Sequence, residues 1–258
     1  MMKILITGTN GYIGKHLSQV SPYDVTCLHR GVCDLTNKED VDNFFVQFGK
    51  FDVVIHCAVS GGSRLKNDED DVFHNNIQMF LNLVRNKDSF DRLIHFGSGA
   101  EKIDKGAYGF SKRVIANMIE ELDNFYNLRI YGLFDENELS TRFIKSCVTA
   151  CLNDTDIEVH GTKKMDFFHM KDLESIINFY ISSIEPPKTI DCCYSEKYYL
   201  HEIADHIRKY LKTNTEIHYH LTEPTEYIGE GSLCLDGIID DDFIKRLNEN
   251  IDILKEKK

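Results

Sequence analysis

The fold is decided by the stretch Lys3-Ile4-Leu5-Ile6-Thr7-Gly8-Thr9-Asn10-Gly11-Tyr12-Ile13-Gly14. A short apolar run enters a turn that is punctuated by three glycines, and the residues that follow have helical spacing. Glycine permits a positive φ and a close approach of the backbone, and a helix N-terminus offers unpaired N–H groups to phosphate. The stretch therefore predicts a strand, turn and helix that hold a pyrophosphate, with contacts from Gly8, Asn10, Gly11, Tyr12, Ile13 and Gly14.

The composition is that of an acidic, globular protein. The 258 residues are 42% hydrophobic, which suffices for a full core, and carry a formal net charge of -12. This charge argues against nucleic acid or an anionic membrane as the main partner, because both reward clustered Lys and Arg. The sequence has neither an apolar run of about 20 residues nor an apolar signal segment, so we expect a cytoplasmic protein.

The eight cysteines predict reduced thiols in a chain of this size. Some of them, including Cys27, lie in apolar strand-like runs, where a cysteine behaves as a small buried hydrophobe. Cys147 and Cys151 are one helical turn apart, and His218 and His220 alternate along an expected strand. Neither pair has a companion pair at zinc-site spacing, and we therefore predict no metal site.

Strands and helices alternate regularly through residue 134. The expected strands fall at 3–7, 23–28, 51–58 and 91–96, and the fifth strand with its exit loop falls at 127–134. The segments between them have helical spacing, and such alternation predicts an α/β fold with a doubly wound parallel Rossmann sheet.

Beyond residue 134 the pattern changes, and the last helix is expected at 238–247. No linker separates this part of the chain from the rest, so we expect a small C-terminal substrate lobe that is interleaved with the sheet. The dinucleotide-binding domain is predicted at 1–135 plus about 170–195, and the lobe at 136–169 and 196–258.

The residue that ends the second predicted strand bears on the choice of cofactor. An acidic side chain there hydrogen-bonds the ribose 2′-hydroxyl of NAD, whereas a basic one accommodates the 2′-phosphate of NADP. Here the residue is Arg30, which favours NADP. NAD stays possible, because an arginine in an exposed turn needs no ligand.

Tyr108 and Lys112 are four residues apart on an expected helix and can project together from one face. A cation beside a phenol lowers the pKa of the phenol from about 10, so the tyrosine can exchange a proton with a substrate oxygen nearer neutral pH. The preceding strand delivers Ser98, whose hydroxyl can hold that oxygen. These three residues are the predicted catalytic set.

Together the motifs resemble the extended short-chain dehydrogenase/reductase superfamily of NAD(P)-dependent epimerases and dehydratases, in its nucleotide-sugar branch. The residues that carry the resemblance are Thr7-Gly8-x-x-Gly11-x-x-Gly14, Asp34-Leu35, His56-Cys57-Ala58, Asn76, Ser98, Tyr108-x-x-x-Lys112 and Phe168-His169-x-x-Asp172-Leu173. They occur in this order along nearly the whole chain.

The resemblance implies a role for individual residues. Asp34 and Leu35 would flank the adenine of the cofactor, and Ala58 would lie against the cofactor. Tyr108 would be the general acid or base, and Lys112 would hold the nicotinamide ribose. The serine at the end of the fourth strand would bind the reacting oxygen.

Within the branch, the arginine after the second strand resembles reductases of nucleotide-linked 4-keto-6-deoxy sugars, the group of GDP-fucose synthase and dTDP-4-dehydrorhamnose reductase. GDP-fucose synthase has a cysteine where this chain has Ala100, which argues against a double epimerisation. Met165 replaces an arginine that many relatives carry. Substrate contacts are expected at Ser60, Arg142 and His169.

The leading hypothesis is an NADP-dependent reductase of the 4-keto group of a nucleoside-diphosphate 6-deoxysugar in activated-sugar biosynthesis. A nucleotide-sugar epimerase or dehydratase with bound NAD is the enzymatic alternative, in which Glu101 would be the only carboxylate beside the serine. A catalytically silent NADP-binding regulatory module is a third hypothesis. Members of the superfamily often dimerise through two helices, which implies a homodimer with a four-helix interface from residues 71–86 and 107–122.

Overall fold

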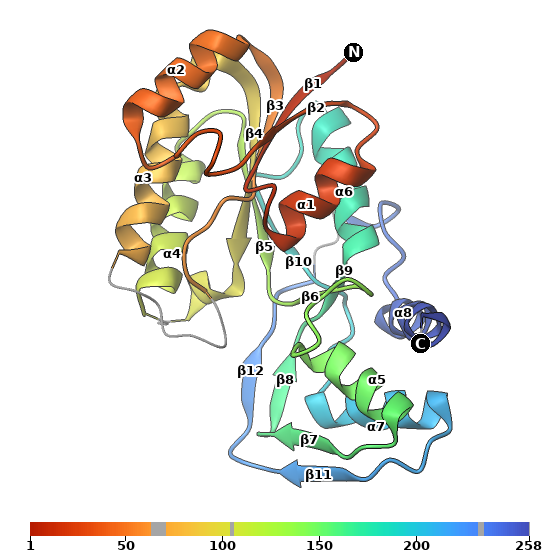
Figure 1. Ribbon diagram of the computed structural model, residues 1–258. Helices are drawn as coiled ribbons and strands as arrows, with labels where there is room; N and C mark the ends of the chain where they lie inside the picture. The colour runs from red at the N-terminus through yellow and green to blue at the C-terminus, as the bar shows by residue number, and fades with distance from the viewer. Residues whose placement is uncertain (63–70, 104–105, 232–234, 258) are drawn as a thin grey trace. The chain divides into compact units, whose positions relative to one another are not determined.

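The structure is a computed structural model that describes residues 1–62, 71–103, 106–231 and 235–257 (Figure 1). The chain divides into two compact units, each built from two segments of sequence. Unit 1 comprises Met1–Arg129 and Tyr180–Ile190, and unit 2 comprises Ile130–Phe179 and Asp191–Lys258. None of the helices among the described residues is long and apolar enough to span a bilayer.

Strands and helices alternate up to residue 130. In chain order the elements are β1 (Lys3–Thr7), α1 (Tyr12–Val20), β2 (Asp24–Leu28), α2 (Lys38–Phe48), β3 (Phe51–His56), α3 (Val72–Arg85), the 3-10 helix η1 (Lys87–Ser89), β4 (Phe90–Ser98), the 3-10 helix η2 (Gly99–Lys102), α4 (Gly106–Glu120) and β5 (Phe125–Ile130). Figure 1 shows α2, α3 and α4 on one face of the sheet and α1 on the other. The prediction of a doubly wound sheet is confirmed.

The six-stranded sheet has the order β10-β5-β4-β3-β1-β2, where β10 is Thr189–Cys192. β1 pairs in parallel with β2 and with β3, so that Ile4 lies opposite both Val25 and Val53. The chain therefore passes from β1 to β2 on one side of β1 and then crosses to β3 on the other side. In open α/β sheets, ligands bind outside the carboxyl ends of the strands at such a switch point.

The core of unit 1 lies between the sheet and helices α2, α3 and α4. Phe44, Phe80 and Ile119, one from each helix, pack with Leu5 and Val54 of the sheet in one buried cluster. Burying a side chain of this size stabilises a fold by about 1.5–3 kcal/mol. The cluster therefore fixes the strands whose ends carry the candidate site.

The expectation that Cys27 is a buried hydrophobe is wrong. Its thiol is exposed, because β2 is the edge strand of the sheet. The buried cysteines among the described residues are Cys33, Cys147, Cys151, Cys192 and Cys193.

From residue 133 onward the chain forms short strands and helices. The elements are β6 (Leu133–Phe134), α5 (Phe143–Asn153), β7 (Ile157–His160), β8 (Lys163–Met165), β9 (Phe168–His169), α6 (Met170–Ser182), α7 (Leu200–Leu211), β11 (Ile217–His220), β12 (Thr225–Tyr227) and α8 (Phe243–Glu256). Three two-stranded parallel sheets result, in which β6 pairs with β9, β7 with β11 and β8 with β12.

The last helix begins and ends later than the predicted 238–247. Helix α8 starts after Asp242, whose side chain caps it by accepting a hydrogen bond from the Lys245 N–H. Aspartate favours the cap over the helix interior, because its carboxylate competes for nearby backbone groups. Leu247 and Ile251 are buried and hold the helix to Glu256.

Candidate active site

The glycine turn after β1 leaves no room for side chains. Gly8 has a φ of +68°, and a Cβ built on it would lie 2.6 Å from the backbone N of Ala58. A Cβ on Gly14 would lie 2.5 Å from the carbonyl O of Gly8. Real Cβ atoms do not approach so closely, so the turn, α1 and the end of β3 can pack together only with glycine at these positions.

The N-terminus of α1 fits an anionic group. Gly11 is the N-cap and supplies no side-chain hydrogen bond, and the first turn, which begins with Tyr12 and Ile13, contains no acidic residue. Amide N–H groups without a side-chain cap, together with the positive end of the helix dipole, favour a negative ligand. The turn therefore fits the pyrophosphate of a dinucleotide.

Gly8→Ala is expected to weaken dinucleotide binding and to lower the free energy of unfolding. Backbone strain alone costs about 1–3 kcal/mol, and the contact with Ala58 adds to it. Gly49→Ala is the matched control, because Gly49 has a φ of +70° and a Cβ there meets nothing within 4 Å. Denaturant unfolding and a fluorescence titration with NADPH measure the two effects. Equal losses of stability in both variants would contradict the close packing at Gly8.

A cavity of about 280 Å³ opens beside the glycine turn, at the carboxyl ends of β1, β2 and β3. The predicted contact residues that line it are Gly8, Asn10, Gly11, Arg30, Asp34, Leu35, Ala58 and Ser60. The structure therefore brings predicted contact residues from three separate strand ends to one cavity. The predicted cofactor contacts Tyr12, Ile13, Gly14 and Lys112 are not among the residues that line it.

Three further residues that line this cavity, His29, Val59 and Met79, are not among the individually predicted contacts. Val59 belongs to the loop after the third predicted strand, which the strand-end rule places toward a ligand, and the same rule applies to His29 after the second strand. Met79 lies on α3 and reaches the cavity only through the packing of that helix, for which the sequence has no local signal.

Arg30 and Asp34 form an ion pair beside the cavity. The Nε of Arg30 lies 3.3 Å from Oδ2 of Asp34, and the Arg30 side chain is 79% exposed. Thr36 donates its N–H and its hydroxyl to Oδ1 of Asp34, at 3.0 and 2.8 Å. Burial alone would raise the pKa of Asp34, but the Thr36 hydrogen bonds and the Arg30 charge lower it. The carboxylate thus orders the loop after β2.

Ser98 ends β4 and caps η2. Its hydroxyl accepts a hydrogen bond from the Ala100 N–H at 3.2 Å, and its own N–H donates to Oε1 of Glu101 at 2.8 Å. The Glu101 side chain is 3% exposed, and its Oε2 pairs with Nε of Arg129 at 2.6 Å. Burial raises the pKa of Glu101, and the ion pair with Arg129 opposes that rise. Glu101 therefore holds the loop that carries Ser98.

The structure brings Tyr108 and Lys112 together on α4. The Nζ of Lys112 is 5.9 Å from the centroid of the Tyr108 ring. The same Nζ donates to the carbonyl O of Phe96 at 2.6 Å and lies 3.5 Å from Nε2 of His95. Lys112 is buried, and burial lowers its pKa to about 8. The lysine is therefore a positioned cation next to a phenol.

The start of α4 packs against η2. A Cβ on Gly109 would lie 2.9 Å from the carbonyl O of Ala100. Gly109 follows Tyr108, and Ala100 comes two residues after Ser98. The segments that carry the predicted serine and tyrosine are therefore in direct contact.

Asn76 on α3 connects the loop after β3 to α4. Its Oδ1 accepts a hydrogen bond from the Ser60 N–H at 2.8 Å, and its Nδ2 donates to the Ser60 carbonyl at 3.0 Å. The same Nδ2 donates to Oγ of Ser111 at 3.0 Å, and that hydroxyl donates to the Tyr108 carbonyl at 2.7 Å. The buried amide of Asn76 thus positions Ser60, which lines the cavity, and through Ser111 the helical turn that carries Tyr108.

Two buried histidines lie beside Lys112, and sequence reasoning assigns neither a role. The rings of His56 and His95 are 5.3 Å apart, and Nδ1 of His56 lies 2.9 Å from the hydroxyl of Thr7. Burial lowers the pKa of His56 to about 3 and that of His95 well below its ordinary value. Both rings are therefore neutral near pH 7. The sequence signal that could have pointed to them is a polar residue near the end of each of two apolar strands, His56 in β3 and His95 in β4.

The other predicted substrate residues, Arg142 and His169, lie in unit 2. Arg142 is the N-cap residue of α5. His169 is buried, its N–H donates to the hydroxyl of Tyr194 at 3.2 Å, and its Nδ1 accepts the Lys171 N–H at 3.2 Å. Its Nε2 is buried without a hydrogen-bond partner among the residues that the structure describes.

Asp172, from the same motif as His169, forms a buried ion pair with Arg246 of α8. Arg246 donates from Nε to Oδ2 at 2.9 Å and from Nη2 to Oδ1 at 2.6 Å. The side chain of Asp172 is 0% exposed and that of Arg246 is 11% exposed. The hydroxyl of Tyr194 also donates to Oδ2, at 2.5 Å. Sequence reasoning missed Arg246, because 74 residues separate it from its partner.

The chain is similar in structure to several solved nucleotide-sugar enzymes. A GDP-mannoheptose C4 reductase from Campylobacter jejuni, solved with NADP bound, shares 18% identity at a TM-score of 0.79, with 99% of this chain and 97% of that chain covered. A dTDP-4-dehydrorhamnose reductase from Clostridium acetobutylicum shares 20% identity at a TM-score of 0.80, with 98% of this chain and 100% of that chain covered. A dTDP-glucose 4,6-dehydratase from Bacillus anthracis in complex with NAD shares 14% identity at a TM-score of 0.80, with 100% of this chain and 97% of that chain covered.

These identities establish a shared fold. A comparison of the sequence with curated proteins found no match. The sequence model of one protein family matches residues 4–193, which include the glycine turn, the loop after β4 and the Tyr108–Lys112 pair. On this match the chain belongs to the NAD dependent epimerase/dehydratase family.

Proposed function

We propose that this protein is an NADP-dependent reductase of the 4-keto group of a nucleoside-diphosphate 6-deoxysugar, acting in activated-sugar biosynthesis. The observation that carries the proposal is the placement of Tyr108 and Lys112 on α4, with 5.9 Å between the ammonium and the ring centroid. The glycine turn and the cavity beside it belong to the same unit as these two residues. Membership of the family supports the proposal.

In this reaction the protein supplies binding, geometry and a proton. When bound, the cofactor provides a hydride from its nicotinamide. Tyr108 donates its hydroxyl proton to the oxygen of the reduced carbonyl, and Ser98 orients that oxygen through its own hydroxyl. Lys112 stabilises the negative charge that forms on the tyrosine. The residues proposed to hold the cofactor are those of the glycine turn together with Arg30, Asp34, Leu35, Ala58 and Lys112.

The position of Arg30 supports NADP as the cofactor. Its guanidinium is exposed and lines the cavity, and its link to Asp34 is a single contact of 3.3 Å. A guanidinium with most of its donors in solvent can bind a 2′-phosphate, which NAD lacks.

Arg30→Asp is expected to weaken the use of NADPH relative to NADH. Loss of a charged hydrogen bond costs about 1.5–3 kcal/mol, which corresponds to roughly a ten- to hundredfold change in the ratio of kcat/KM values. Steady-state kinetics with both cofactors measure it. Arg85→Asp, at another exposed arginine of unit 1, is the control. An unchanged preference in the Arg30 variant would contradict the assignment.

The substrate is proposed to contact Ser60, Arg142 and His169. Ser60 lines the cavity, and Arg142 supplies a positive charge suited to a diphosphate. The Nε2 of His169, which has no hydrogen-bond partner within the described part of the chain, is proposed as a donor or acceptor for a sugar hydroxyl. We propose that residues 1–135 plus about 170–195 bind the cofactor. Residues 136–169 and 196–258 are proposed to bind the substrate.

The geometry around Glu101 disfavours the dehydratase alternative. A dehydratase needs an additional acid and base near the serine. The carboxylate of Glu101 is buried, paired with Arg129 and bonded to the Ser98 N–H. A side chain held in this way supports the loop and is not available to exchange protons with a sugar.

We also propose a homodimer through α3 and α4. Phe110 on α4 is 52% exposed, and its ring stacks on that of Phe73 on α3 at 5.0 Å. Leu81 on α3 is 37% exposed. A second copy of these two helices would bury these apolar side chains in a four-helix interface with two-fold symmetry.

Phe110→Asp is expected to convert the dimer to monomers, because a charge at the centre of an apolar interface loses its hydration. Val46→Asp is the control, since Val46 is 85% exposed on α2, outside the proposed interface. Sedimentation equilibrium measures the mass. A monomeric wild-type protein, or a dimeric Phe110 variant, would contradict the interface.

The substrate class is tested by incubating the protein with NADPH and a panel of GDP-, dTDP-, UDP- and CDP-linked 4-keto-6-deoxy sugars. NADPH consumption with one member of the panel and formation of the corresponding 4-hydroxy sugar are expected. Conversion of a nucleotide sugar without any net consumption of NADPH would instead support the epimerase or dehydratase alternative.

A further inference from the structure

The strand pair β7 and β11 in unit 2 gathers histidines from two distant parts of the chain. The strands are parallel, and their register places His220 directly opposite His160 and His218 opposite Glu158. Ile157 and Val159, the alternate residues of β7, are buried. Because side chains alternate between the faces of a strand, Glu158 and His160 share the opposite, exposed face.

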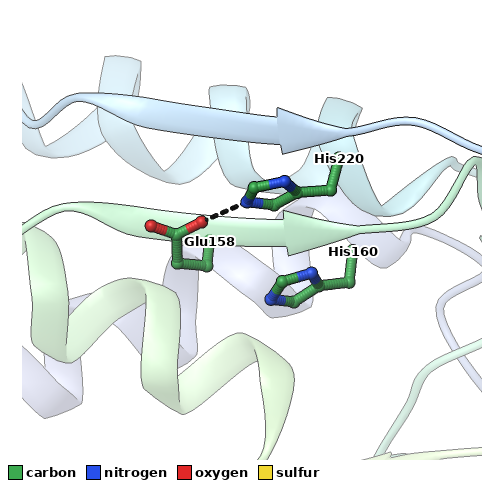
Figure 2. Close-up of side chains that lie close together, drawn as sticks. All are labelled: Glu158, His160 and His220. Atoms are coloured by element: carbon green, nitrogen blue, oxygen red, sulfur yellow. Dashed lines mark hydrogen bonds and ion pairs between the residues drawn. The ribbon is translucent and has the colours of Figure 1, made fainter.

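Three side chains on this exposed face lie close together. Figure 2 shows Glu158, His160 and His220 projecting to the same side of the two strands. The Nε2 of His220 is 2.6 Å from Oε2 of Glu158, and the two imidazole rings stack with centroids 4.6 Å apart. One potential ligand atom from each of the three residues lies within 4.8 Å of the others.

From this geometry we infer that Glu158, His160 and His220 form a binding site for a divalent transition-metal ion, with Zn²⁺ as the representative. Two imidazole nitrogens and one carboxylate oxygen are a ligand set that suits Zn²⁺. The ligand atoms would close on an ion at about 2.0–2.2 Å by rotation of exposed side chains. All three side chains are exposed, so water can complete the coordination shell.

The neighbouring group Asp156, Glu216 and His218 provides an internal comparison. Its potential ligand atoms also lie within 4.8 Å of one another, but it offers a single imidazole and two carboxylates. Borderline metals such as Zn²⁺ favour nitrogen ligands, whereas oxygen-rich sets suit Mg²⁺ and Ca²⁺. The inferred site is therefore the pair of histidines with Glu158.

An ion at this site would cross-link two strands that are far apart in sequence. Glu158 and His220 are separated by 62 positions, and β11 follows α7 whereas β7 follows α5. A ligand at free concentration c that binds only the folded state stabilises it by RT ln(1 + c/Kd) and so raises the melting temperature. The inference concerns the stability of unit 2 and is independent of the proposed reductase activity.

The experiment is a calorimetric titration of the untagged, chelator-treated protein with Zn²⁺, together with melting curves with and without the ion. It is done in a Cys27→Ser background, because the thiol of Cys27 is exposed. The inference predicts one ion per chain, no displacement by excess Mg²⁺, and a higher melting temperature with Zn²⁺.

Variants assign the ion to its ligands. His160→Ala and His220→Ala are each expected to weaken Zn²⁺ binding by about tenfold or more and to reduce the rise in melting temperature at the same Zn²⁺ concentration. His218→Ala, on the same strand β11 as His220, is the matched control. It is expected to bind Zn²⁺ like the Cys27→Ser parent protein. Equal melting temperatures of all variants without metal show that folding is intact. Absence of stoichiometric binding by the parent, unchanged binding by the His220 variant, or an equal loss in the His218 variant would overturn the inference.

Discussion

Tyr108→Phe is expected to lower kcat roughly 10²–10⁴-fold, which is the usual contribution of a positioned general acid. The substitution removes only the hydroxyl, and the ring that lies against Gly62 and 5.9 Å from the Lys112 ammonium is kept. Binding of NADPH and the free energy of unfolding should therefore stay near the wild-type values. Steady-state kinetics on the substrate found with the panel, fluorescence titration and denaturant unfolding provide the three measurements.

Tyr210→Phe is the matched control for this experiment. Tyr210 is an exposed residue of α7 whose hydroxyl bonds Asp252, so its loss should leave kcat unchanged. A Tyr108→Phe variant that turned over at the wild-type rate would remove the tyrosine from the mechanism. It would also revive the hypothesis of a catalytically silent NADP-binding module.

Asp172→Asn is expected to lower the free energy of unfolding by about 3–5 kcal/mol, because it leaves the guanidinium of Arg246 without its buried counter-charge. The carboxylate is fully buried and receives two hydrogen bonds from Arg246 and one from Tyr194. Glu249 also contacts Arg246, at 2.8 Å, and this places the expected loss toward the lower end of the range. Urea unfolding followed by circular dichroism measures the change.

Two further variants make this result specific. Asp42→Asn breaks an exposed ion pair with Arg85 and should leave the unfolding midpoint nearly unchanged. Adding Arg246→Met to Asp172→Asn removes the unpaired charge and should recover part of the lost stability, so that the two effects are not additive. A loss no larger than that of the Asp42 variant would show that the pair does not hold α8 in unit 2.

The sheet of unit 1 could be predicted because its signals are local. An apolar run such as Lys3–Thr7 followed by a glycine turn predicts a strand and a helix without knowledge of the rest of the chain. The bounds of α8 could not be predicted in the same way. They depend on a cap at Asp242 and on the burial of Ile251, and burial is decided by the partners that the fold supplies.

The same distinction applies to the candidate site. Tyr108 and Lys112 are four residues apart on one helix, so spacing alone places them on one face. The amide of Asn76 positions Ser60 and Ser111 across 16 and 35 residues, and such contacts follow only from tertiary packing. The histidine cluster of β7 and β11 is similar, because linear spacing does not show that these two strands pair.

We propose that the protein transfers a hydride to C4 of the sugar and that Tyr108 supplies the proton. The most direct test is the reaction of the 4-keto sugar with NADPH deuterated at the transferable position of the nicotinamide, followed by mass spectrometry and NMR of the product. We expect deuterium at C4 in stoichiometric amount, with equal formation of NADP⁺. A product without deuterium at C4, formed without net oxidation of NADPH, would contradict it.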